Sequence, residues 1–187
     1  MTIAKPYRTR CWFYIPDATA KAGDHVPWST WQEMGHCQII TKPTISKQVI
    51  IDKYQELCDE YNIVSSMSDK FGYPEIMQIA EDNGVDLDSH EAVAMNLKNN
   101  DEGIKKLQQM LFNRDLAWQS PVLTFCIDNC RVSVAKSGAL QIDRIKSKRR
   151  ASSKIDGASC LMLCALMVAK SSESSFQSGL DLSNLFL

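Results

Sequence analysis

The chain has 187 residues, 44% of them hydrophobic, and a formal net charge of −1 at pH 7. This length and hydrophobic content suit one globular domain with its own core, and the balanced charge excludes a general polyanion-binding protein. The apolar run at residues 158–169 is shorter than the ~20 residues that a membrane-spanning helix needs. None of the seven cysteines forms a Cys-x-x-Cys pair, so we expect buried free thiols.

The first half of the chain alternates predicted strands with predicted helices. Residues 10–15 are aromatic and β-branched, which predicts a strand that Pro16 ends, with its aromatic side chains in the core or at an interface. The further elements of this half are a helix at 27–34, a strand at 36–40, a helix at 46–61, a buried strand at 62–69, a helix at 74–82 and a strand at 85–87.

The second half continues with helices and one predicted hairpin. Its elements are a helix at 101–112, a helix at 122–129 that Ser120-Pro121 caps, a hairpin of strands 131–135 and 140–143, and a helix from Ser153 to about Ser171. The alternation of strands and helices predicts an α/β fold, in which a mixed sheet is covered by helices.

The chain is organised around its last helix. A basic run, Lys146 to Arg150, leads into it, and Ser152 or Ser153 suits its N-cap. Asp156 then falls in the first turn, where the positive end of the helix dipole stabilises a carboxylate. Such an acid is ordinarily part of the cap, and a role in a site is the alternative.

Asp69 ends the predicted strand at 62–69, and sites in open α/β sheets lie beyond the carboxyl ends of the strands. Asp156, at a helix N-terminus, could reach the same edge. Carboxylates at such an edge suit Mg²⁺ or Mn²⁺, and a pair of metals would support phosphodiester hydrolysis. Acids are also common at strand ends and helix caps, so the spacing leaves both interpretations open.

Several short motifs occur in an order that resembles the nuclease domain of tailed-phage large terminases, the motors that package DNA into capsids and cut it. The resemblance runs from about Arg10 to Lys170. The matching motifs are Trp12-Phe-Tyr-Ile-Pro-Asp17, Val26-Pro-Trp-Ser-Thr-Trp31 before Gly35, Ser68-Asp-Lys-Phe-Gly72, Ala94-Met95, Pro121-Val-Leu followed by Asp128-Asn129, and Lys154-Ile-Asp-Gly157.

The resemblance implies a ribonuclease H-like fold and DNA cleavage with Mg²⁺ or Mn²⁺ held by acidic residues. Asp69 matches the acid that ends the central strand, Asp156 matches the late acid, and Asp143 stands where the family often has another acid. The implied partners are double-stranded DNA, the terminase small subunit and the portal protein, in the cytoplasm of the bacterial host, with no membrane. Residues 1–172 would form the nuclease domain and residues 173–187 a tail.

The chain departs from the family pattern in two ways. No acid precedes Arg10 where the family has its first-strand Asp, and no phosphate-binding Gly-x-x-x-x-Gly-Lys motif of an ATPase is present. We therefore expect a domain that is incomplete at its N-terminus. The tail motif at 179–183 resembles that first strand; chance is the simpler explanation, and a permuted strand that supplies Asp181 is the sharper one.

The basic residues near Asp156 form the predicted DNA contact, as a loop that holds phosphates without reading bases. They are Lys146, Lys148, Arg149, Arg150 and Lys154. An ordinary solvated loop is the alternative interpretation. For the whole chain, the alternatives to a nuclease are a non-catalytic domain that binds DNA or a packaging partner, and a structural fragment.

Overall fold

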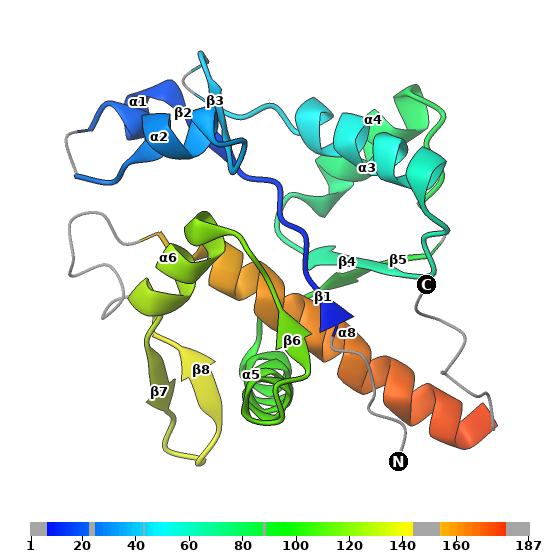
Figure 1. Ribbon diagram of the computed structural model, residues 1–187. Coiled ribbons are helices and arrows are strands. Elements are labelled where there is room, and N and C mark those ends of the chain that lie inside the picture. The colour runs from blue at the N-terminus through cyan, green and yellow to red at the C-terminus, as the bar shows by residue number, and fades with distance from the viewer. Residues whose placement is uncertain (1–6, 23–24, 43, 88, 144–153, 179–187) are drawn as a thin grey trace.

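The computed structural model describes residues 7–22, 25–42, 44–87, 89–143 and 154–178 (Figure 1). Helix α8 (Asp156–Ser178) runs through one half of the molecule, with α5 (Leu97–Phe112) and α6 (Pro121–Asn129) against it. Met162 and Leu166 of α8 are 1% and 0% exposed, so this helix is the centre of the main core. The helix runs to Ser178, beyond the predicted end at about Ser171 and across the proposed domain boundary.

The strands of the described segments pair only two by two, so the single mixed sheet that we expected is not formed there. Three pairs are parallel and the hairpin is antiparallel. The pairs are β1 (Tyr7–Arg8) with β6 (Leu116–Ala117), β2 (Tyr14–Pro16) with β3 (Gln38–Ile40), β4 (Ser66–Asp69) with β5 (His90–Val93), and β7 (Val132–Val134) with β8 (Leu140–Ile142). The α/β class is confirmed in this coarser form.

The N-terminal part packs around Trp28, which is 1% exposed and stands at the start of α2 (Trp28–Glu33). Its ring meets the ring of Trp31 edge-on at 5.3 Å. The strand predicted at residues 10–15 is shorter than expected, because only the last residues of this segment belong to the observed strand β2. Helix α1 (Asp17–Ala20) follows β2 directly. Trp12 is 44% exposed, so its ring lies outside the core, and a place at an interface stays a prediction.

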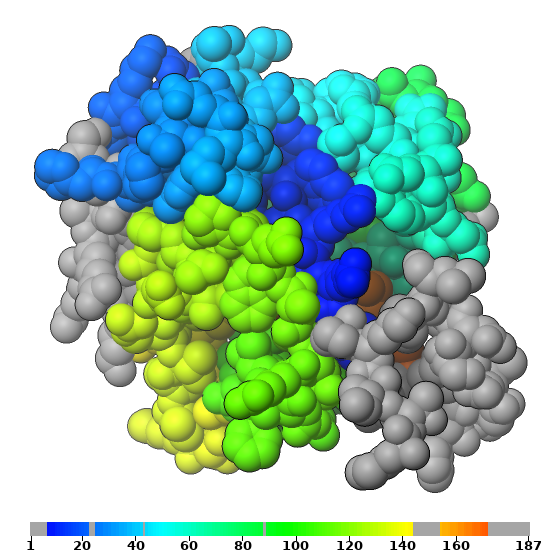
Figure 2. Space-filling model, viewed as in Figure 1, coloured from blue at the N-terminus to red at the C-terminus, as the bar shows by residue number. Residues whose placement is uncertain are grey.

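Helices α3 (Gln48–Glu60) and α4 (Tyr73–Asp82) pack together through Ile51 and Ala80, with Leu87 in the same cluster. The strand predicted at 85–87 is absent, and β5 forms a few residues later. Leu87 is buried from a loop, so its apolar character reflects packing against the helices. In Figure 2 the N-terminal segment, in dark blue, lies between the cyan surface of α3 and the green surface of α5 and α6.

The cysteines are all free, as expected, but not all are buried. Cys37 and Cys126 are buried, whereas Cys58, Cys160 and Cys164 are exposed. The prediction of buried thiols is therefore correct only in part. Within the described segments, no helix combines the length and the hydrophobicity that a bilayer span requires.

Candidate functional site

A cleft of about 460 Å³ opens at the carboxyl end of β4. Four segments that are far apart in the sequence contribute to it. The lining residues are Asp69, Phe71, Met95, Leu97, Asn100, Gln141, Ile142 and Ser159. The cleft therefore joins the predicted strand-end acid to the first turns of α5 and α8 and to the hairpin.

Asp69 is held in place by the strand pair and by its own loop. It faces Val93 of β5 in the parallel register, and the next backbone N–H, of Lys70, donates to the Val93 carbonyl oxygen at 2.8 Å. Asp69 Oδ1 accepts a hydrogen bond from the Phe71 N–H at 3.1 Å. One carboxylate oxygen therefore fixes the turn after β4, which is a local structural role that the sequence did not reveal.

Helices α5 and α8, which both line the cleft, approach each other closely at a glycine. A Cβ atom on Gly103 would lie 2.9 Å from Met162 Cγ and 3.0 Å from the Met162 carbonyl oxygen. One turn before Gly103, Asn100 is 8% exposed and its Nδ2 donates to the Asn96 carbonyl oxygen at 2.8 Å. This packing positions Asn100 and Ser159 as two walls of the cleft.

The hairpin is tied to α5 by Asp101. Its Oδ1 accepts the Leu140 backbone N–H at 2.8 Å, and its Oδ2 accepts from Lys105 at 2.7 Å. Both bonds lower the pKa of Asp101, and the Lys105 side chain is the larger cause. This role could not be predicted from local patterns, because Asp101 and Leu140 lie far apart along the chain.

Asp156 is exposed at the start of α8, as expected of an acid in the first turn. The cleft reaches α8 one turn later, at Ser159, and Asp156 is not among its lining residues. The next residue, Gly157, is packed so tightly that a Cβ would lie 3.0 Å from the Phe13 ring. Burial raises the pKa of the adjacent Cys126 thiol, although the Gly157 N–H donates to its sulfur.

Of the other predicted site residues, Asp143 and Lys154 lie within the described residues. Asp143 directly follows β8, next to the cleft-lining Ile142, and its N–H donates to the Arg131 carbonyl oxygen at 2.7 Å. Lys154 is half-buried two residues before α8. Four predicted DNA-binding residues lie outside the described residues, together with the cap candidates Ser152 and Ser153 and the tail acid Asp181. The four are Lys146, Lys148, Arg149 and Arg150.

The donors around the cleft suit a hard cation, since the Asp69 carboxylate lies there with the amide groups of Asn100 and Gln141 and the Ser159 hydroxyl. Among the described residues, however, no three His, Cys, Asp or Glu side chains are grouped closely enough to hold a metal ion. The assignment of Asp69, Asp143 and Asp156 as metal ligands therefore stays a prediction.

The opposite face of β4 carries a polar network around His90. The ring lies between two serines of β4, with Nδ1 2.7 Å from Ser66 Oγ and Nε2 2.9 Å from Ser68 Oγ. It also stacks on the Tyr73 ring at 5.3 Å. Burial lowers the pKa of His90. Both ring nitrogens of His90 are thus within hydrogen-bond distance of serine hydroxyls, and His90 braces the strand that ends in Asp69.

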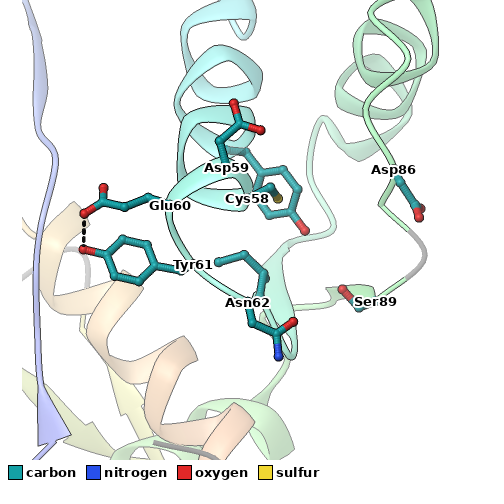
Figure 3. Close-up of a pocket in the computed structure, with 9 residues that line it drawn as sticks. Cys58, Asp59, Glu60, Tyr61, Asn62, Asp86 and Ser89 are labelled. Atoms are coloured by element: carbon teal, nitrogen blue, oxygen red, sulfur yellow. Dashed lines mark hydrogen bonds between the residues drawn. The ribbon is translucent and has the colours of Figure 1, made fainter. Parts of the chain in front are cut away.

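A second recess, of about 600 Å³, lies at the C-terminal end of α3 (Figure 3). It also contains acids, but Figure 3 shows them coming from different sides: Glu60 points toward the Tyr61 hydroxyl, which donates to it at 2.6 Å, and away from Asp86. Carboxylates that diverge in this way do not make a metal site, so the cleft at Asp69 is the better candidate.

Among the comparisons with known proteins, the search of solved structures found matches. No family model and no curated protein matches the chain. The structure of the HK97 bacteriophage large terminase matches with a TM-score of 0.73 and 18% identity, over 82% of this chain and 32% of that chain. The large terminase nuclease from thermophilic phage G20c matches with a TM-score of 0.49 and 13% identity, over 64% of this chain and 61% of that chain. The chain thus spans about a third of the length of the HK97 protein.

Proposed function

We propose that this chain, which has a terminase large-subunit nuclease-like fold, is a metal-dependent DNA endonuclease domain that cuts concatemeric DNA during phage genome packaging. The observation that most supports the proposal is Asp69, a carboxylate at the carboxyl end of a parallel strand, in a cleft with oxygen donors from three other segments. Double-stranded DNA, the small subunit, the portal protein and the host cytoplasm belong to the same proposal.

In this proposal Asp69, Asp156 and Asp143 would hold Mg²⁺ or Mn²⁺. An ion bound there would lower the pKa of an attacking water and would stabilise charge on the scissile phosphate. Asp69 has one oxygen engaged by the Phe71 N–H, so the turn aims the carboxylate before any metal binds. The α8 N-terminus carries a partial positive charge, which suits a phosphate held next to Asp156. Lys154 and the basic residues 146–150 would hold the flanking phosphates.

The first test measures metal-dependent nicking of a supercoiled plasmid, together with thermal melting, for the parent chain and Asp69→Asn. We expect slow nicking by the parent in Mn²⁺ and none by the variant. The amide keeps an oxygen acceptor for the Phe71 N–H, so the melting temperature without metal should be unchanged. Mn²⁺ should raise the melting temperature of the parent and leave that of the variant unchanged, because a bound ligand stabilises the folded state.

The control is Asp59→Asn, which removes the same charge from the recess at the end of α3. This variant should nick and bind Mn²⁺ as the parent does. Equal nicking by Asp69→Asn and the parent would remove Asp69 from the site. Loss of nicking in Asp59→Asn alone would move the site to the other recess.

A second function, DNA binding without cleavage, is favoured by the lack of a three-carboxylate group among the described residues. A domain of this kind would bind duplex DNA with a salt-dependent affinity, through its basic residues, and would show neither nicking nor a Mn²⁺-dependent rise in melting temperature. The same two assays therefore separate the two functions.

A further inference from the structure

Phe71 has a large apolar side chain that the rest of the folded chain leaves almost fully exposed to solvent. Its side chain is 92% exposed, although it lines the same cleft as Asp69. Burial of a Phe ring stabilises the folded state, so a ring left in water forgoes most of this stabilisation. Phe112, at the end of α5, is 89% exposed but lies outside the cleft, which makes it a natural comparison.

The loop that carries Phe71 is fixed at three points. Its own N–H is bonded to the Asp69 carboxylate at 3.1 Å. The next residue, Gly72, has φ of 76°, in the left-handed region that favours glycine. The Gly72 carbonyl oxygen accepts from Lys47 Nζ at 3.1 Å, and Lys47 is also paired with Glu75. A ring on a loose loop could fold back onto apolar surface, whereas this backbone holds the ring out in solvent.

The surroundings of the ring fit a nucleic acid strand better than a protein surface. Lys70, next to Phe71, is also exposed, which places a cation beside an open aromatic face. The rest of the cleft presents carboxylate, amide and hydroxyl groups, and its apolar lining is limited to Met95, Leu97 and Ile142. Proteins that bind single strands combine cations for the phosphates with aromatic rings on which bases stack.

We propose that Phe71 is a stacking platform for an unpaired base of the DNA strand that enters the Asp69 cleft. The inference rests on the proposed function and extends it to substrate choice: the chain binds DNA with a locally unpaired strand better than it binds intact duplex. The roles of Asp69 and Phe71 are linked, because the Asp69 carboxylate accepts the Phe71 N–H and so orients the backbone that carries the ring.

The test titrates the 187-residue chain with a fluorescent single-stranded 20-mer and with the same sequence as a duplex, in EDTA so that nothing is cut. Phe71→Ala should weaken single-strand binding about 5- to 150-fold, the range for the loss of one stacked base, and should change duplex binding less. The slope of log K against log salt should stay the same, because the ring contacts no phosphate. Phe71→Leu should show most of the loss, and Phe71→Trp should restore binding.

Phe112→Ala is the matched control, since it removes an equally exposed ring, and it should bind as the parent does. Parental single-strand affinity in Phe71→Ala, which is expected if the ring instead docks a protein, overturns the inference. An equal loss in Phe112→Ala also overturns it. If the parent nicks plasmid with Mn²⁺ while Phe71→Ala binds normally, the nuclease proposal stands without the stacking role. If the parent neither binds nor nicks DNA, both fail.

Discussion

Replacement of Gly103 by alanine tests how closely α5 must approach α8. In an ordinary helix interior this change would stabilise the protein by about 0.5–1 kcal/mol, because glycine loses more conformational freedom on folding. Here the added methyl group would lie 2.9 Å from Met162 Cγ, 3.0 Å from the Met162 carbonyl oxygen and 3.4 Å from Leu166 Cβ. The side chain can turn away, but the carbonyl oxygen belongs to the backbone of a buried helix.

Overpacking of this kind costs about 1–3 kcal/mol, which exceeds the gain in propensity. We therefore expect Gly103→Ala to lower the free energy of unfolding by about 1–2 kcal/mol, and the melting temperature by about 2–8 °C for a chain of this size. The measurement is thermal and urea unfolding followed by circular dichroism. Gln108→Ala, at an exposed position of the same helix, should change stability by less than about 0.5 kcal/mol.

A Gly103→Ala variant as stable as the parent, or more stable, would refute the close contact between α5 and α8. The contact also matters for the site, because α5 and α8 carry Asn100 and Ser159 on the walls of the cleft. A variant that unfolds earlier should therefore also lose some of its Mn²⁺-dependent stabilisation.

Two further predictions concern the supports of the cleft. Asp101→Ala removes the acceptor of the Leu140 N–H, so amide hydrogen exchange should quicken in the hairpin, and more than in Lys105→Ala, which leaves that bond in place. Burial lowers the folded-state pKa of His90 below the ordinary histidine value of 6.5, so the unfolded chain takes up the proton first. Stability should therefore fall as the pH drops below about 6.5 and level off below the folded-state pKa. In a plot of melting temperature against pH, His90→Gln should flatten this part of the curve. An unchanged curve would contradict the role of burial.

Local signals predicted the hairpin and most of the helices, although α1 was missed and α8 runs beyond its predicted end. Ser120-Pro121 predicted the start of α6, and Ser120 Oγ accepts the Leu123 N–H as an N-cap should. Gly138 has φ of 84° in the hairpin turn, where the sequence placed it. These features depend on residues within one or two turns of each other, so the sequence contains all the information that they need.

Local sequence could not show whether the strand would form at residues 85–87 or a few residues later, at β5. Both segments are short and partly apolar, and a strand exists only where a partner offers its backbone groups. The register that pairs Ser66 with His90 leaves Leu87 in the loop before β5. The exposure of Trp12 is a similar case, since an aromatic segment shows hydrophobic character and does not show which elements cover it.

The sequence predicted that Asp69 ends a strand and that Asp156 lies in the first turn of a helix, because strand ends and helix caps have local signatures. Which residues surround Asp69 depends on how distant segments pack together. The cleft is made by β4, the loop into α5, the hairpin and α8, and the packing that joins them includes Gly103 of α5 against α8. Such contacts arise from long-range packing, in which shape and distance matter and sequence spacing carries no signal.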